Sequence, residues 1–351
     1  MSHKTFNYQA PFELESGIIL PGYHLGYHAF GKLNADKSNV VWIFHALTAN
    51  SNPVDWWPGL VGGGHLIDPE HFFIVCVNMP GSCYGSLGPL SVNPITGDPY
   101  YHSFPFFTSR DMIKAYQPLK DFLGIDKIKI GIGGSMGGQQ LLEWAIEEPE
   151  LFDHIVPIAT NAFHSAWARA FNASQRHCIE LDPTWKNNDP EAGLDGMKVA
   201  RGVALLSYRN QETYNFNQTD ADLNSMSSFR SESYQRYQGE KLAARFNAFS
   251  YYFLSQSMDS HQVGRGRGSV IAALKKIKAK THLIGIQSDL LFTEKEQVFL
   301  AENIPGAFLY MIPSGFGHDG FLLEFDAISS IILDFIQLET RTPKSTAYTV
   351  N

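Results

Sequence analysis

The chain has 351 residues, of which 44% are hydrophobic and 18% are charged, so it is long and apolar enough to bury a sizeable core in one large domain or in two. Its formal net charge of -8 argues against nucleic acid as a partner, because no broad basic surface would offset phosphate repulsion. The three cysteines form no metal-ligand pair, and no apolar run approaches the roughly 20 residues of a membrane span, so we expect a cytoplasmic protein with no metal and no membrane contact.

Continuous apolar segments of strand length recur along the chain, each rich in β-branched or aromatic residues. A segment that is apolar at every position is typical of a strand buried on both faces, so these segments predict a mostly parallel central sheet flanked by helices. The six segments span residues 40–44, 72–77, 128–132, 155–158, 282–286 and 308–312. Residues 17–31 alternate between apolar and polar instead, and we expect an antiparallel hairpin there at the edge of the sheet.

Helical segments separate these strands and, in one region, replace them. A buried helix face is predicted by the spacing of Met112, Ile113, Tyr116, Leu119 and Leu123. The strand pattern stops between about residues 161 and 280, where polar and aromatic helical segments such as 239–257 take over. We therefore expect a mainly helical cap of residues 161–280, inserted into an α/β core formed by residues 1–160 and 281–351. A separate helical domain is the alternative.

The sharpest motif is Gly133-Gly134-Ser135-Met136-Gly137, a G-x-S-x-G sequence between the strand segment 128–132 and the helical segment 139–147. This strand–turn–helix context predicts a nucleophile elbow, in which a tight turn lifts the serine to the carboxyl edge of the sheet. The turn also places Ser135 at a helix N-terminus, where backbone N–H groups face an oxyanion. We interpret Ser135 as the nucleophile of an α/β-hydrolase fold; a glycine-rich turn without chemistry is the alternative.

A serine nucleophile needs a base, and this fold places an acid and then a histidine after the serine in chain order. Of the 13 histidines, His318 fits best, because it lies in a glycine-rich loop between the last strand segment and the final helix. Asp289 lies just after the segment 282–286, where the orienting acid is expected. The order Ser135, Asp289, His318 predicts a catalytic triad. A histidine that caps the last helix and an aspartate that stabilises a turn are the alternatives.

The oxyanion hole of this fold combines two backbone N–H groups, one from the residue after the nucleophile and one from the loop after an earlier strand. The sequence places these donors at Met136 and at Leu47, which follows the segment 40–44. Since only backbone atoms are used, side-chain identity says little about this assignment. His45, in the same loop, is interpreted as a packed residue rather than a second base.

Further segments, read together with the elbow, resemble the homoserine O-acetyltransferase family of α/β-hydrolase-fold acyltransferases. They run from the first core strands to the last helix, so the resemblance spans nearly the whole chain. The matching segments are His45-Ala46-Leu47-Thr48, Asp55-Trp56-Trp57, Asn78, Gly81-Ser82-Cys83-Tyr84-Gly85-Ser86, Ser91-Val92-Asn93-Pro94, Arg110-Asp111-Met112, Gly133 to Gly138 with Glu143-Trp144-Ala145, Ser207-Tyr208-Arg209, Ser288-Asp289 and Gly317-His318-Asp319-Gly320-Phe321-Leu322.

The resemblance implies ping-pong acetyl transfer from acetyl-CoA, a co-substrate rather than a tightly bound cofactor, to the side-chain hydroxyl of L-homoserine in methionine biosynthesis. It implies that Arg201 binds the carboxylate of homoserine and Asp319 its ammonium. A zwitterionic acceptor independently requires one fixed cation and one fixed anion. Arg201 as a solvated helix residue and Asp319 as a loop cap are the alternatives. The resemblance also implies a homodimer, paired through the helical cap.

Two departures from the family pattern leave the substrates open. Pro80 stands where an aliphatic residue is common, and Phe316 stands where tyrosine is frequent. A succinyl-CoA donor or a serine acceptor is therefore an alternative, giving homoserine or serine O-succinyltransferase or serine O-acetyltransferase activity. A plain esterase or thioesterase is a further alternative, because the same triad can transfer the acyl group to water. A catalytically silent binding protein is the alternative outside enzymes.

Two weaker features complete the sequence. Residues 264–268 form a Gly-Arg-Gly-Arg-Gly loop, which either meets the phosphates of coenzyme A or lies exposed and flexible. Cys83 falls within a family segment, and we expect it to be structural rather than nucleophilic. No clustered spacing of His, Cys, Asp or Glu predicts a metal site.

Overall fold

The computed structural model describes residues 2–341, with side chains described as far as Ile336. Its centre is an eight-stranded sheet in the order β1-β4-β6-β5-β7-β8-β9-β10, and β2 pairs with β3 beside it. The strands are β1 (Lys4–Tyr8), β2 (Phe12–Glu13), β3 (Ile19–Leu20), β4 (Tyr23–Phe30), β5 (Val40–Phe44), β6 (Phe73–Val77), β7 (Ile128–Gly134), β8 (Phe152–Ile158), β9 (Lys280–Ile286) and β10 (Phe308–Ile312). All six predicted strand segments are confirmed, with small differences at their ends.

Helices connect and cover these strands. They are α1 (Pro53–Trp56), α2 (Ser109–Phe122), α3 (Met136–Glu147), α4 (Ala166–Glu180), α5 (Leu194–Tyr208), α6 (Gln211–Gln218), α7 (Arg230–Ala243), α8 (Ala248–Asp259), α9 (Val270–Leu274), α10 (Glu294–Asn303) and α11 (Phe325–Arg341), with short 3-10 helices η1 (Tyr101–Ser103) and η2 (Gly317–Leu322). Within residues 2–341, no helix is both long enough and apolar enough to cross a membrane.

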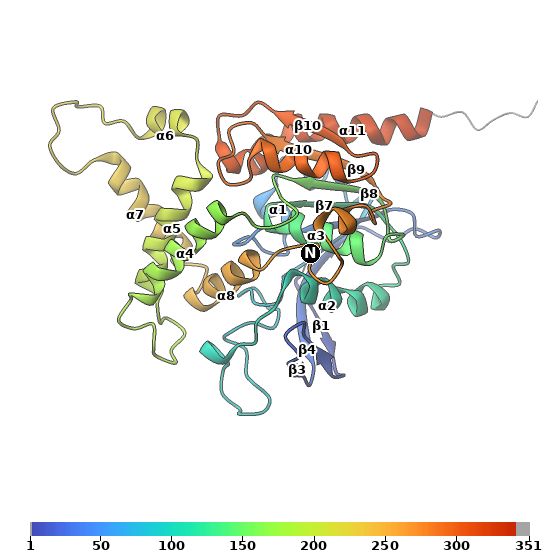
Figure 1. The fold of residues 1–351 in the computed structure, drawn as a ribbon, viewed down its shortest axis with the longest axis horizontal. Helices are drawn as coiled ribbons and strands as arrows, with labels where there is room; N and C mark the ends of the chain where they lie inside the picture. The colour runs from blue at the N-terminus through green and yellow to red at the C-terminus, as the bar shows by residue number, and fades with distance from the viewer. Residues whose placement is uncertain (1, 342–351) are drawn as a thin grey trace, which may run out of the picture.

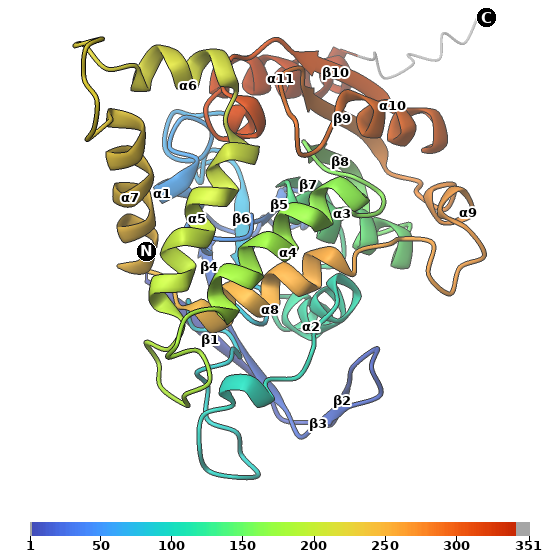
Figure 2. The same ribbon diagram turned by 60° about the vertical axis from the view of Figure 1, so that its left-hand side comes forward.

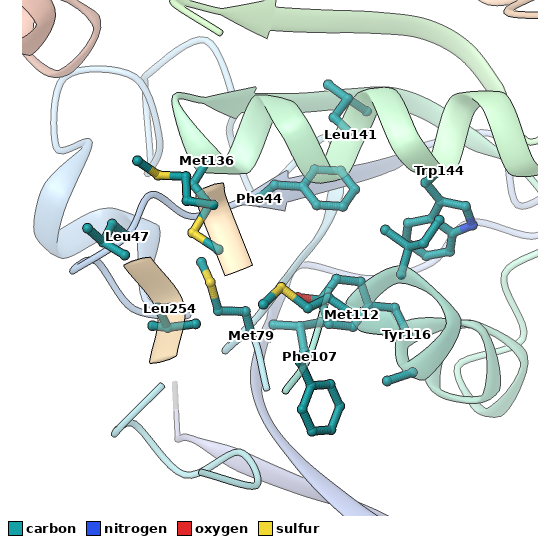
Figure 3. Close-up of a cluster of buried hydrophobic side chains, with 14 of the residues drawn as sticks. Phe44, Leu47, Met79, Phe107, Met112, Tyr116, Met136, Leu141, Trp144 and Leu254 are labelled. Atoms are coloured by element: carbon teal, nitrogen blue, oxygen red, sulfur yellow. The ribbon is translucent and has the colours of Figure 1, made fainter. Parts of the chain in front are cut away.

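The sheet from β6 to β10 is parallel, and its two faces carry separate halves of the core. Trp42 and Phe44 of β5 pack toward α2 and α3, where the Trp42 ring lies 5.0 Å from that of Trp144. The alternate residues Val41 and Ile43 pack on the opposite face against α11. A strand that is buried on both faces has no polar position, which explains its continuous apolar sequence. Figure 3 shows Phe44 in the same cluster as Tyr116 of α2 and Trp144 of α3.

The hairpin predicted for residues 17–31 is wrong in its pairing. β4 lies between β1 and β6 and is antiparallel to both, whereas β3 pairs with β2. Most of β4 is buried, so it is an interior strand rather than an edge, and each of its edges needs a partner. On this side of the sheet the edge strand is β1, near the N-terminus.

Between β8 and β9 the chain leaves the sheet and forms the helices α4 to α9. Figures 1 and 2 show α4 to α8 gathered on one side of the sheet, with α6 and α7 farthest from it. Within residues 161–279, all of which are described, no strand is formed, and β9 begins at Lys280. The helical content predicted for this stretch is therefore confirmed.

The continuous helix predicted over residues 239–257 is wrong, because the chain breaks between α7 and α8. The Oδ1 atom of Asn247 accepts a hydrogen bond from the N–H of Ser250 at 2.7 Å and caps the start of α8. Asparagine is among the strongest N-capping residues, and this cap favours a new helix over continuation of the old one. The break leaves Arg245 in a short connection that faces the core.

Candidate active site

Ser135 stands at the end of β7 and immediately before α3, in a backbone conformation that side chains rarely adopt. Its φ is 57° and its ψ is -125°. A methyl group at Gly137 would lie 2.2 Å from the carbonyl oxygen of Phe44, and one at Gly133 would lie 2.6 Å from the carbonyl of Gly137. Only glycine fits at these two positions, so the two outer glycines of the motif are what allow this turn to form between β5 and α3.

Asp289 and His318 meet at the same edge of the sheet, after β9 and β10. The Nδ1 atom of His318 lies 2.7 Å from Oδ2 of Asp289, and both side chains are almost fully buried. The other oxygen of Asp289, Oδ1, accepts hydrogen bonds from the N–H groups of Leu291 and Phe292 at 2.8 and 2.9 Å. The carboxylate is thereby fixed, and it fixes in turn the tautomer of His318 that carries its proton on Nδ1.

Aromatic packing brings the histidine loop against the elbow. The ring of Phe321 lies 5.1 Å from that of His318, and a methyl group at Gly134 would come within 2.3 Å of the same Phe321 ring. The indole N–H of Trp57 donates to the carbonyl oxygen of Phe321 at 2.8 Å. Phe292 stacks on the other side of His318, at 4.9 Å between ring centroids. These contacts hold the imidazole beside the turn that carries Ser135.

Nε2 of His318 and Oγ of Ser135 are both available to exchange a proton. Within residues 2–341 no hydrogen bond engages Nε2 of His318 or Oγ of Ser135, and none joins the two. Catalytic hydrogen bonds are often long before a substrate binds and tighten in the reactive complex. The structure thus brings the three sequence-predicted triad residues to one edge of the sheet, with the histidine–acid contact formed.

The two N–H groups predicted for the oxyanion hole lie close to this edge. Leu47 follows β5 and Met136 begins α3, and both residues are buried. In the described part of the chain neither N–H has a hydrogen-bond acceptor. A buried N–H without a partner costs free energy, so two of them beside a nucleophile point to an oxygen atom that a ligand supplies. In Figure 3 the side chains of Leu47 and Met136 lie at the same end of the core cluster.

Two contacts hold the loop that carries Leu47. His45 is buried, and its Nε2 accepts a hydrogen bond from the N–H of Met79 at 3.0 Å. Burial lowers the pKa of His45 to about 4, which agrees with a neutral packed residue rather than a second base. From the connection between α7 and α8, Nη1 of Arg245 donates to the carbonyl oxygen of Thr48 at 2.5 Å and to the hydroxyl of Tyr84 at 2.6 Å. This connection is therefore hydrogen-bonded to the residue after Leu47.

A cavity of about 250 Å³ lies between α5, α7 and η2. It contains both residues assigned to the acceptor, Arg201 and Asp319. Tyr208 links Arg201 to the triad, because the guanidinium lies 5.6 Å from its ring centroid and the same ring lies 5.7 Å from that of His318. The sequence-predicted cation and anion therefore share one cavity near His318. The complete lining is Arg201, Arg209, Gln238, Lys241, Leu242, Arg245, Asp319, Leu322 and Leu323.

Sequence reasoning missed the residue that positions Asp319. Nη1 of Arg209, at the end of α5, forms an ion pair with Oδ2 of Asp319. The sequence shows Arg209 only as part of the segment Ser207-Tyr208-Arg209, and nothing in this segment indicates a partner far along the chain. The ion pair fixes the orientation of a carboxylate that would otherwise rotate freely.

The Gly-Arg-Gly-Arg-Gly loop matches neither of its two interpretations. Arg265 forms a bidentate ion pair with Glu15, and Arg267 lies 2.6 Å from Glu143 and 2.9 Å from Glu147. Arg110 joins the two halves, at 2.9 Å from Glu15 and 3.5 Å from Glu143. We call this network the clasp: Glu15, Arg110, Glu143, Arg265 and Arg267. Both loop arginines are paired with glutamates of the chain itself, Arg267 largely buried and Arg265 partly exposed.

The remaining candidates are structural. Cys83 has its Sγ atom 3.6 Å from the carbonyl oxygen of Arg245, and burial raises the pKa of its thiol to about 11, so it is not a thiolate near neutral pH. Pro80 is buried and Phe316 is half-exposed beside Arg209. Among the described residues, no group of three or more His, Cys, Asp or Glu side chains is placed to hold a metal ion.

Comparison with known proteins agrees with this geometry. A family model described as the alpha/beta hydrolase fold matches residues 39–325. The homoserine O-acetyltransferase of Cyclobacterium marinum is 45% identical to this chain, and the match covers 95% of each. Among solved structures, the homoserine O-acetyltransferase from Bacillus anthracis has a TM-score of 0.88 at 22% identity, covering 95% of this chain and 97% of that one. Esterase E22 has a TM-score of 0.86 at 24% identity, covering 95% and 99%. These two structural likenesses show the fold alone.

Proposed function

Since the chain belongs to the homoserine O-acetyltransferase family within the α/β-hydrolase fold, we propose that it transfers an acetyl group from acetyl-CoA to the side-chain hydroxyl of L-homoserine. The product would serve methionine biosynthesis. Acetyl-CoA acts as a co-substrate that enters and leaves, not as a resident cofactor.

One observation carries the proposal beyond the family: the cavity next to His318 contains a cation, Arg201, and an oriented anion, Asp319. An enzyme whose acceptor is water needs neither charge. A zwitterionic amino acid needs both, because each of its charged ends must find a partner when it leaves water. In this proposal Arg201 binds the carboxylate, Asp319 binds the ammonium, and Arg209 keeps Asp319 in place.

The first half-reaction acylates Ser135. His318 takes the hydroxyl proton at Nε2, the Oγ atom attacks the thioester carbonyl, and the developing oxyanion is stabilised by the N–H groups of Leu47 and Met136. The carbon–sulfur bond then breaks, and His318 gives its proton to the departing thiolate of coenzyme A. Asp289 holds the imidazole and stabilises its charged form.

The second half-reaction runs the same steps with another nucleophile. His318 takes the proton of the homoserine hydroxyl, and the homoserine oxygen attacks the carbonyl carbon of acyl-Ser135. The bond between this carbon and the serine oxygen breaks, and the proton returns to Ser135. Transfer dominates over hydrolysis when the bound acceptor replaces water near the acyl group.

The test is a matrix of donors and acceptors: acetyl-, succinyl- and propionyl-CoA against homoserine, serine and water. Mass spectrometry should find one acetyl group on Ser135 after mixing with acetyl-CoA, and homoserine should remove it. Ser135→Ala should abolish the adduct. Release of free acetate at the same rate without homoserine would identify a hydrolase, and faster acylation by succinyl-CoA would overturn the choice of donor.

We extend the proposal to the organisation of the chain. Residues 161–280 would act as a cap over a core of residues 1–160 and 281–351, and two cytoplasmic chains would pair through their caps. Phe216, Leu223 and Met226 support pairing, because each is more than four-fifths exposed on the α6–α7 arm. Sedimentation of the intact protein, with Phe216→Ser and Met226→Ser together as the comparison, should show a dimer that the double variant weakens. A monomeric wild-type protein would contradict the pairing.

A further inference from the structure

Two cations at the rim of the acceptor cavity have no carboxylate partner among the described residues. Lys241, near the end of α7, and Arg245, in the connection to α8, are both exposed and both line the cavity. The protein as a whole is acidic, and every arginine of the clasp is paired with a glutamate. Cations without a partner at the rim of a cavity attract an anion that comes from outside the chain.

The cavity is too small to contain an entire acyl-CoA. Its volume of about 250 Å³ lies below the range of roughly 300–1,000 Å³ that holds drug-sized ligands. It suits an amino acid, which the proposed function places there. The nucleotide part of the donor must therefore remain outside, at the rim, while the flexible pantetheine arm reaches inward toward Ser135.

We propose that Lys241 and Arg245 form the subsite for the phosphate groups of the acyl-CoA donor, an inference that rests on the proposed function. The ligand class is a phosphorylated nucleotide thioester, and the groups recognised are its diphosphate and its ribose phosphate.

Arg245 is preorganised for this role. Its Nη1 donates to Thr48 and Tyr84, which fixes the plane of the guanidinium, whereas Nε and Nη2 make no hydrogen bond in the described residues. A planar pair of free N–H donors matches two oxygens of one phosphate. Lys241 adds a mobile point charge four residues earlier. The other two arginines of the cavity have other roles, because Arg209 is paired with Asp319 and the proposed function assigns Arg201 to the acceptor carboxylate.

The test compares two donors that differ in their phosphates: acetyl-CoA and S-acetyl-N-acetylcysteamine, a thioester without phosphate. Lys241→Gln should raise the KM for acetyl-CoA roughly 10-fold, the worth of one charge-assisted hydrogen bond, and leave kcat/KM for the phosphate-free thioester unchanged. Arg236→Gln is the matched control, because Arg236 lies on the same helix and pairs with Glu232. It should behave as wild type with both donors. Equal effects of Lys241→Gln on both donors, or no effect on either, would overturn the subsite.

A binding measurement separates this inference from the proposed function. Calorimetry with 3′-phosphoadenosine 5′-diphosphate, the nucleotide part of coenzyme A alone, should show binding to wild type and to Arg236→Gln, and binding weakened roughly 10-fold in Lys241→Gln. Binding of this pattern by a protein that never acetylates Ser135 would refute the function and keep the subsite. Acetylation of Ser135 without any nucleotide binding would support the function and refute the subsite. Arg245→Lys, which keeps the charge but loses the planar pair of N–H donors, should bind the nucleotide more weakly than wild type does.

Discussion

Two arginine-rich regions of this protein behave in opposite ways. In the clasp, Arg110, Arg265 and Arg267 are joined to glutamates that the chain itself provides. Around the acceptor cavity, Arg201, Lys241 and Arg245 have no such partner among the described residues. A cation neutralised within the fold holds segments together, whereas a cation left without an anion is available to a ligand. The motif that looked most like a phosphate site, the Gly-Arg-Gly-Arg-Gly loop, belongs to the first kind.

The comparison is tested most strongly by removing a buried charge from the clasp. Glu143 is almost fully buried and contacts both Arg267 and Arg110. Glu143→Gln removes the buried anion that Arg110 and Arg267 share and leaves them only the partly exposed Glu15 and Glu147. We therefore expect a loss of about 3–5 kcal/mol in the free energy of unfolding, measured by urea denaturation. The acetyl transfer rate per folded molecule should stay close to that of wild type.

Glu147→Gln serves as the control for this change. Glu147 lies one turn later on α3 and pairs with the same Arg267, but it is exposed to solvent. Its replacement should lower the free energy of unfolding by about 1 kcal/mol or less. A variant of Glu143 that keeps full stability and loses activity would mean that the clasp is part of the active site.

The next largest effect is expected in the cavity and should concern activity instead of stability. Arg201→Gln removes the partner of the acceptor carboxylate, and we expect a loss of roughly 10–100-fold in kcat/KM for homoserine. Single-turnover acetylation of Ser135 should remain normal. Lys198→Gln is the control on the same helix, since Lys198 is paired with Asp195 and Glu240. Equal loss in both half-reactions would contradict the assignment of Arg201.

The pH dependence of stability provides a test of the clasp alone, and the expected effect is smaller. Burial by itself would raise the pKa of Glu15, but hydrogen bonds from Arg265 and Thr108 and the charges of Arg110 and Arg265 hold it at about 2. A pKa lowered by folding stabilises the protein above the ordinary value of 4.5, and this contribution is lost as the pH falls from 4.5 toward 2.

Glu15→Gln should therefore be less stable than wild type at pH 7, by an amount on the order of 1 kcal/mol because solvent screens the pair. The difference should shrink as the pH falls from about 4.5 toward 2. Unfolding curves of both proteins across this range measure it. A difference that stays constant down to pH 2 would show that the charge of Glu15 is not what stabilises the clasp.

The smallest expected effect is that of salt, and it distinguishes the exposed cations from the buried ones. Raising the ionic strength from about 0.1 M to 1 M shortens the Debye length from about 10 Å to 3 Å. The KM for acetyl-CoA should rise by roughly 2–5-fold, because exposed attractions are screened. The stability difference between wild type and Glu143→Gln should persist, since buried charges are screened much less. A KM that does not respond to salt would weaken the role of Lys241 and Arg245.

Much of the fold and of the catalytic edge could be predicted from sequence because the relevant signals are local. The run Val40–Phe44 is apolar at every position, and the elbow motif encodes its own turn through glycines that no other residue could replace. The order Ser135, Asp289, His318 follows from the order of the strands that carry these residues. The structure agrees with each of these predictions, and none of them required knowledge of contacts between distant segments.

The parts that sequence could not supply depend on partners far along the chain. Glu15 and Arg265 are separated by 250 residues, and Thr48 and Arg245 by 197. Nothing in the residues around Arg265 indicates that a glutamate will meet it, so the loop looked exposed. The same holds for β4, whose alternation suggested an edge until β1 was seen to pair with it. Charge compensation and strand order are properties of the assembled core, not of a segment.

The helical insert between β8 and β9 has a consequence of its own. β8 and β9 are adjacent parallel strands, so the helices between them start at the carboxyl end of β8 and finish at the amino end of β9, at the opposite edge of the sheet. Exchanging helices α4 to α8 of that insert for a stretch from another protein would disturb no strand pairing of the central sheet, would keep Arg265 and Arg267 of the clasp, and would leave Ser135, Asp289 and His318 on their original supports. A new acceptor preference could thus be acquired by transplantation of a single continuous stretch, without redesign of the chemistry beneath it.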